Sequence, residues 1–128
     1  MLLYEQTLNI NLTNSNDGQG RSWHGSAKQR NYLRRYFKDN GLERIPFDQR
    51  VAIHVVRIIG PKQRAFDPDS ILRGSMCKAL IDTMVEFGWF HDDKLMHVSQ
   101  VVGSQEVDRD NGPSVRIEIY DEPASFKR

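Results

Sequence analysis

The chain has 128 residues, 38% hydrophobic and 27% charged, which suits one small globular domain and excludes a second folded unit. Eighteen Lys and Arg against seventeen Asp and Glu give a formal charge of +1, which by itself does not indicate a nucleic-acid partner. No stretch approaches the roughly 20 apolar residues of a membrane helix, the first residues do not form a secretion signal, and the single cysteine cannot form an internal disulfide. We therefore expect one cytoplasmic domain over residues 1–128, with a frayed tail at 123–128 and no membrane contact.

The first third of the chain predicts a strand, a loop and a helix. The strand covers about residues 3–12, because apolar and polar residues alternate there with a period of two. Residues 13–20 are nearly all turn-forming types and predict an exposed loop. The helix begins at Ser26, which has capping-box spacing with Gln29, and it ends before Gly41. Its predicted apolar stripe consists of Tyr32, Leu33, Tyr36 and Phe37.

A central strand and a second helix follow. Residues 51–59 are rich in β-branched types on both faces, as in an interior strand, and we expect His54 within it to be a hydrogen-bonded core or cleft residue. The second helix starts at a cap formed by Asp69 or Ser70 and ends at Gly88. The apolar positions of this helix predict a buried, structural Cys77. We expect Trp89 and Phe90 to close the core beneath the helix, whereas stacking of Trp23, Trp89 and Phe90 on nucleic-acid bases is the alternative.

Two strands complete the chain. Alternation over residues 96–102 and again over 115–120 predicts both of them. The turn-forming residues 110–113 lie between them and predict an antiparallel hairpin. The element order is therefore β-α-β-α-β-β, an α/β (α+β) domain with a small mixed sheet of about four strands and two main helices.

The charges are segregated along the chain. Residues 21–38 carry +6 and no acid, whereas residues 67–93 carry six acids against two bases, a local −4. A basic helix can follow a phosphate backbone, although a merely solvated helix face explains the same composition. Lys62 and Arg64 add positive charge beside the acidic cluster, where a solvated surface has no need of it, and favour the nucleic-acid interpretation.

Two pairs of acids are candidates for a metal site. Asp67 and Asp69 flank Pro68, which favours an extended backbone with both carboxylates on the same side. Asp92 and Asp93 follow the second helix, and their loop must fold back if they are to meet the first pair. Carboxylate ligands suit Mg²⁺ or Mn²⁺, whereas a helix cap and a polar loop are the structural alternatives.

Three segments in this order resemble the RusA-like Holliday junction resolvases of bacteria and their phages. They are Asp67-Pro68-Asp69-Ser70, Lys78-Ala79-Leu80-Ile81-Asp82 and Phe87-Gly88-Trp89-Phe90-His91-Asp92-Asp93. The resemblance implies a homodimeric, Mg²⁺-dependent endodeoxyribonuclease with a mixed fold, which cuts four-way DNA junctions symmetrically. It also implies that Asp67, Asp69 and Asp93 are the catalytic metal-binding carboxylates, with Asp92 as an accessory ligand.

The resemblance further implies a functional basic residue on the second helix, and its position corresponds to either Arg73 or Lys78. We expect the DNA to be bound by Arg21, Lys28, Arg30, Arg34, Arg35, Lys38, Lys62 and Arg64. In the predicted mechanism, a metal-activated water attacks a backbone phosphodiester and the basic residue stabilises the developing charge. The alternatives are a nuclease for other branched DNA, such as flaps, and a non-catalytic DNA-binding module.

Overall fold

The fold is known from a computed structural model, which describes residues 2–12, 23–61, 75–91 and 97–121. The elements in chain order are β1 (Leu2–Leu8), α1 (Trp23–Asp39), β2 (Val51–Ile59), α2 (Ser75–Glu86), β3 (Val98–Val107) and β4 (Ser114–Asp121). This order and the four-stranded mixed sheet confirm the predicted α+β fold. No helix within the described ranges is long and apolar enough to cross a membrane.

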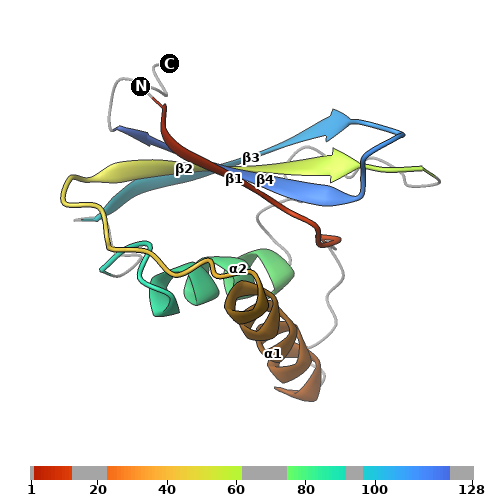
Figure 1. Cartoon of the computed structure of the whole chain (residues 1–128), viewed down its shortest axis with the longest axis horizontal. Coiled ribbons are helices and arrows are strands. Elements are labelled where there is room, and N and C mark those ends of the chain that lie inside the picture. The colour runs from red at the N-terminus through yellow and green to blue at the C-terminus, as the bar shows by residue number, and fades with distance from the viewer. Residues whose placement is uncertain (1, 13–22, 62–74, 92–96, 122–128) are drawn as a thin grey trace.

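The four strands form one sheet in which β2 and β4 occupy the interior positions (Figure 1). The strand order is β1-β4-β2-β3, with β4 antiparallel to both of its neighbours and β3 parallel to β2. The composition of β2 therefore correctly predicts an interior strand. The predicted hairpin between the last two strands is wrong, because β2 lies between them.

The connection from β3 to β4 crosses the end of β2. The amide of Asp108 donates a hydrogen bond of 2.9 Å to the carbonyl of Ile59, which holds this connection against the last residue of β2. The backbones of Gly60 and Gly112 then approach so closely that a Cβ on either glycine would collide with the backbone of the other. The two glycines therefore allow the chain to pass across β2 and to place β4 on its far side.

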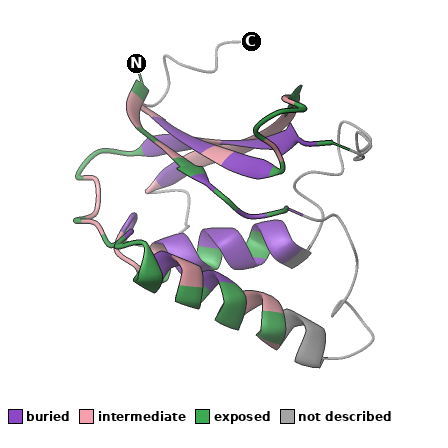
Figure 2. Ribbon diagram, turned by 45° about the vertical axis from the view of Figure 1, so that its right-hand side comes forward, coloured by how far each residue is buried: buried purple, intermediate pink, exposed green. Residues whose placement is uncertain are grey.

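Both helices cover the same face of the sheet (Figure 1), and the buried residues lie mainly between the helices and that face (Figure 2). The buried side chains of the two interior strands that belong to this core alternate along the sequence: Val51, Ile53, Val55, Val115, Ile117 and Ile119. Such alternation is the geometry of a strand that packs one face against a neighbouring layer. Neither α1 nor α2, the two helices of the described ranges, lies on the opposite face of the sheet (Figure 1).

The apolar stripe of α1 is narrower than its sequence predicts. Leu33 and Phe37 are fully buried, as expected, whereas the side chain of Tyr32 is 48% exposed. Tyr36 is half-buried, and its hydroxyl accepts a hydrogen bond of 2.8 Å from the amide of Asn9. Tyr32 therefore does not belong to the core and lies on the exposed side of the helix.

The first strand is shorter than predicted, because β1 ends at Leu8. Its partner β4 begins at Ser114, and the last register pair joins Leu8 to Val115, so β4 extends only one residue beyond this pair. Ile10 and Leu12 are nonetheless buried. The alternating pattern thus correctly identifies the buried residues and overestimates the length of the strand.

Trp89 joins the helices to the sheet. Its indole Nε1 donates a hydrogen bond of 2.7 Å to the carbonyl of Leu42, and its ring contacts Tyr4 edge-on with 5.3 Å between the centroids. Trp89 is fully buried and Phe90 nearly so, which confirms that both residues close the core. Cys77 is also buried, as predicted, and burial raises the pKa of its thiol to about 11.

We predict that Gly88→Ala destabilises the protein more than Gly41→Ala. Both residues end a helix with positive φ, 86° and 62° respectively, so alanine costs roughly 1–2 kcal/mol at either position. At Gly88 the new methyl group also collides with the carbonyl oxygen of Arg44, whereas nothing lies within 4 Å at Gly41. Urea unfolding should show a further loss of roughly 1–3 kcal/mol for Gly88→Ala. Equal losses in the two variants would contradict this account.

Candidate nucleic-acid interface

Most of the predicted catalytic and metal-binding residues lie outside the described ranges. These residues are Asp67, Asp69, Arg73, Asp92 and Asp93. Three of the predicted DNA-binding residues, Arg21, Lys62 and Arg64, lie outside them as well. Within the described part of the chain, no group of three or more His, Cys, Asp or Glu is arranged to hold a metal ion. The predicted metal centre therefore stays a prediction.

The described residues that flank the two acidic pairs lie at opposite ends of β2. Pro61 precedes the first pair and follows the end of β2. His97 follows the second pair, and its carbonyl accepts a hydrogen bond of 3.0 Å from the amide of Val51, the first residue of β2. A strand of nine residues is about 30 Å long. The described framework therefore does not by itself bring the two acidic pairs together.

The remaining predicted DNA-binding residues form a basic face on α1. They are Lys28, Arg30, Arg34, Arg35 and Lys38, and all except the half-buried Arg30 are exposed. Asp39 is the only acidic residue in this helix. The buried Leu33 and Phe37 hold the apolar side of the helix against the core. Packing of α1 therefore leaves most of these five basic residues in contact with solvent.

The spacing of the basic residues on α1 is unfavourable for an isolated helix. Arg30, Arg34 and Lys38 follow one another at intervals of four residues, which places like charges on neighbouring turns. Each such pair destabilises a helix by about 0.2–0.5 kcal/mol, whereas a solvated face gains stability from alternating charges. A nearby anion would relieve this repulsion, and Glu86 of α2 supplies one to Arg34.

A groove of about 340 Å³ lies between α1 and α2. It is lined by Arg34, Arg35, Lys38, Asp39, Glu86 and Phe87. The Nε of Arg34 donates a hydrogen bond of 2.7 Å to the Oε2 of Glu86, and both side chains are about half exposed. The ring of Phe87 packs against Phe37 in the core, with 5.4 Å between the centroids. The groove thus combines three cations, two carboxylates and one aromatic wall.

Lys78, one of the two candidates for the functional basic residue on the second helix, lies on the exposed side of α2. Its side chain is 75% exposed, and its Nζ lies 3.9 Å from Asp82 one turn later. This long, solvent-screened contact restrains the lysine only weakly. Lys78 is therefore free to contact a ligand that approaches α2.

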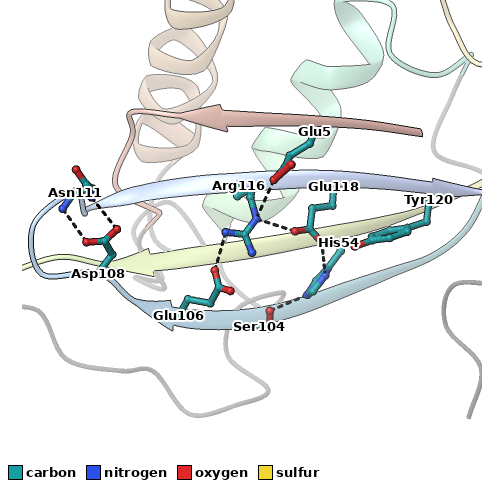
Figure 3. A network of polar contacts seen from close by, with 9 residues as sticks. All are labelled: Glu5, His54, Ser104, Glu106, Asp108, Asn111, Arg116, Glu118 and Tyr120. Atoms are coloured by element: carbon teal, nitrogen blue, oxygen red, sulfur yellow. Dashed lines mark hydrogen bonds and ion pairs between the residues drawn. The ribbon is translucent and has the colours of Figure 1, made fainter. Parts of the chain in front are cut away.

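The open face of the sheet carries a polar network that the sequence did not predict (Figure 3). Arg116 of β4 lies at its centre, with ion pairs to Glu106 of β3 at 2.7 Å, to Glu118 at 2.7 Å and to Glu5 of β1 at 3.4 Å. Since β2 lies between β3 and β4, the pair between Arg116 and Glu106 spans β2. Alternation in β4 indicates a polar face, but the register of the sheet decides which charges meet.

Glu118 connects this ion-pair cluster to His54. Its Oε1 accepts a hydrogen bond of 2.7 Å from the hydroxyl of Tyr120 and lies 3.0 Å from the Nδ1 of His54. The Nε2 of His54 lies 2.7 Å from the hydroxyl of Ser104, which confirms that this histidine is a hydrogen-bonded residue. The carboxylate of Glu118 raises the pKa of Tyr120 to about 12.

The pKa of Glu118 lies below its ordinary value despite burial. Burial alone would raise this pKa, but hydrogen bonds from Tyr120 and Arg116, the charge of Arg116 and the contact with His54 together lower it. The pKa of Glu106 is also lowered, mainly by its hydrogen bond with Arg116. Three carboxylates around one guanidinium leave this face with excess negative charge, which disfavours a phosphate backbone there.

A larger cavity, of about 740 Å³, lies at the edge of the network. Glu106, Asp108 and Arg116 contribute its charged lining, together with Thr7, Asn9, Ile58, Val107, Asn111 and Ser114. Arg116 is already paired with three carboxylates, and Asp108 accepts hydrogen bonds from the backbone and side chain of Asn111. Among the described residues, Arg116 is the only Lys or Arg that lines this cavity, so the cavity is a poorer site for a phosphate than the groove between α1 and α2.

No protein-family profile matches this chain, and no curated protein matches it either. Membership of the junction-resolvase family is therefore a proposal that rests on the sequence motifs.

We predict that Glu118 makes the stability of the fold depend on acid pH. Since the folded state lowers the pKa of this group, its ionised form stabilises the fold above about pH 4.5, and that contribution is lost as the pH falls further. Glu118→Gln should lower the free energy of unfolding at pH 7 by roughly 1–3 kcal/mol. It should also flatten the decline of stability that sets in as the pH falls below about 4.5.

Unfolding titrations at several pH values test this prediction. The exposed residue Glu43 supplies the matched control, because Glu43→Gln makes the same charge change away from the network. An acid-induced decline as steep in Glu118→Gln as in the wild type would contradict the assigned role.

Proposed function

We propose that the protein is a Mg²⁺-dependent, structure-selective endonuclease that resolves four-way DNA junctions. The observation that carries the DNA-binding part of this proposal is the basic face of α1, where like charges recur every four residues. The three-segment resemblance to RusA-like resolvases supports the catalytic part. Neither half of the proposal depends on the near-neutral total charge.

The basic face of α1 has the chemistry needed to bind a DNA backbone. Most non-specific affinity for DNA comes from Lys and Arg that neutralise phosphates and release condensed counterions. The acidic network lies on the open face of the sheet (Figure 3), and α1 packs on the opposite face (Figure 1). We infer that DNA approaches the helical layer and avoids the open face.

Catalysis is assigned to the residues of the acidic segments. Asp67, Asp69 and Asp93 would hold Mg²⁺ or Mn²⁺, with Asp92 as an accessory carboxylate. The bound ion would lower the pKa of a water and neutralise charge on the scissile phosphate. Arg73 or Lys78 would stabilise the additional negative charge that develops as the phosphodiester is attacked.

A homodimer is part of the same proposal. A four-way junction has two equivalent strands to cut, and symmetric cleavage requires two active sites related by a two-fold axis. One chain supplies one acidic constellation, so a second copy would supply the other. Resolution of both strands in one binding event would then be the expected outcome.

A non-catalytic DNA-binding module is the second candidate. It is favoured by the basic face of α1, because Lys and Arg side chains bind phosphate without a metal ion. In that case Asp69 would only cap the second helix, and Asp92 and Asp93 would only belong to a polar loop. The two candidates make opposite predictions about metal-dependent cleavage.

We predict that the protein cuts a synthetic four-way junction in the presence of Mg²⁺ and that Asp69→Asn abolishes cutting without abolishing binding. The variant keeps every basic residue of α1, so its affinity for the junction should be retained. Gel analysis of labelled junction, flap and linear duplex, with and without Mg²⁺, measures both properties. Asp48→Asn, at an exposed position outside the acidic segments, is the control.

The outcomes separate the candidates. Preferential cutting of the flap would reassign the substrate to other branched DNA. Binding of the junction without any cleavage over a range of Mg²⁺ and Mn²⁺ concentrations would overturn the nuclease proposal in favour of the binding module.

We also predict that Arg35→Gln weakens DNA binding and reduces its salt dependence. Loss of one phosphate contact should make the slope of log K against log salt about 0.9 shallower for duplex DNA. Fluorescence anisotropy at several salt concentrations measures the slope. Arg50→Gln, which removes an exposed arginine outside α1, should leave the slope nearly unchanged. Equal effects of the two substitutions would show that the basic face of α1 is not the interface.

A further inference from the structure

We propose that the groove between α1 and α2 is a binding site for a DNA backbone phosphate and that Glu86 occupies it in the absence of DNA. This inference rests on the proposed DNA-binding function and adds a regulatory contact to it. The carboxylate of Glu86 takes the position of a phosphate on Arg34, and DNA must displace it in order to use this arginine.

The contact between Arg34 and Glu86 has the form of an arginine–anion pair. A single hydrogen bond of 2.7 Å joins the Nε of Arg34 to the Oε2 of Glu86. Carboxylate and phosphate oxygens are interchangeable acceptors for a guanidinium group, because both present charged oxygens to its N–H donors. The same N–H group can therefore bind either the side chain of Glu86 or a phosphate.

The exposure of the pair makes the exchange inexpensive. The side chains of Arg34 and Glu86 are 47% and 48% exposed, so water and salt already screen their attraction. A pair of this kind contributes little to folding, and the buried Leu33 and Phe37 hold α1 in place without it. Displacement of Glu86 therefore leaves the helix packing intact.

The other walls of the groove favour a nucleotide backbone over a free inorganic anion. Arg35 and Lys38 lie beside Arg34 and supply two further cations, so three cations face the one carboxylate among the described lining residues, that of Asp39, which remains once Glu86 is displaced. The half-buried ring of Phe87 adds an apolar wall, which suits the deoxyribose that accompanies each phosphate in DNA. A volume of about 340 Å³ is large enough for more than a bare phosphate.

Asp82 provides a matched comparison on the same helix. It lies one turn before Glu86, it carries the same charge, and it contacts Lys78 at 3.9 Å. It does not line the groove. Substitution of either acid changes the net charge of α2 equally. Asp82→Asn releases Lys78, which its long contact restrains only weakly, whereas Glu86→Gln releases the tightly held Arg34 inside the groove.

The test is the affinity for a short DNA duplex, measured without divalent metal by fluorescence anisotropy. Glu86→Gln should bind about two- to fivefold more tightly than the wild type, the factor expected from removing one exposed competing ion pair. Asp82→Asn should gain clearly less. The gain from Glu86→Gln should disappear in an Arg34→Gln background, since a double-mutant cycle isolates the coupling between the two residues.

Each outcome distinguishes this inference from the proposed function. If neither the wild type nor Glu86→Gln binds DNA, both the proposed function and this inference are wrong. If the wild type binds DNA but Glu86→Gln gains no more than Asp82→Asn, only the inference fails. Inorganic phosphate tests the identity of the ligand. If millimolar phosphate displaces DNA from the wild type but Glu86→Gln binds DNA no more tightly than the wild type, the assignment of the groove to a DNA backbone phosphate is overturned.

Discussion

In the part of the chain that the structure describes, both helices pack on one face of the sheet, and the other features of this protein depend on that constraint. On the helical side, β2 contributes a continuous apolar surface to the core. On the open side, Val56 is still only 1% exposed, although neither of the two described helices covers it. The ion pair between Arg116 and Glu106 spans β2 on that side, so long charged side chains act as the cover that a second helical layer would otherwise provide.

The charged side chains on the open face are held in place by contacts between strands. The network connects all four strands, from Glu5 on β1 through Arg116 on β4 to His54 on β2 and Ser104 on β3. Buried carboxylates stabilise a fold only when donors satisfy them, and Glu118 has three such neighbours. The face therefore has its polar groups committed to one another and is poorly suited to bind a polyanion.

The helical layer has the opposite character. Because α1 buries only a narrow apolar stripe, most of its surface is available for basic residues, and Tyr32 is exposed among them. The same packing that buries Phe37 beside Phe87 sets the spacing of the two helices, which brings Arg34 opposite Glu86. A net charge of +1 thus conceals an acidic face and a basic face whose separation is a property of the fold.

The sequence by itself determined the features that depend on local pattern. Its β-branched run matches the bounds of β2 at Val51–Ile59, and its glycines mark the ends of both helices at Gly41 and Gly88. The acidic pairs are likewise visible as spacing, but their convergence needs contacts distant in sequence and stays a prediction. Local pattern suffices for the first group because hydrogen bonds and caps within an element involve near neighbours.

Only the tertiary structure decided which elements are neighbours. The alternating patterns of β3 and β4 are the same whether the two strands pair directly or lie on either side of β2. The close approach of Gly60 to Gly112 allows the second arrangement, which the structure adopts. Likewise, Arg34 and Glu86 are 52 residues apart, and their contact follows from helix packing alone. Strand register and helix packing depend on how whole surfaces fit together, and no short stretch of sequence contains that information.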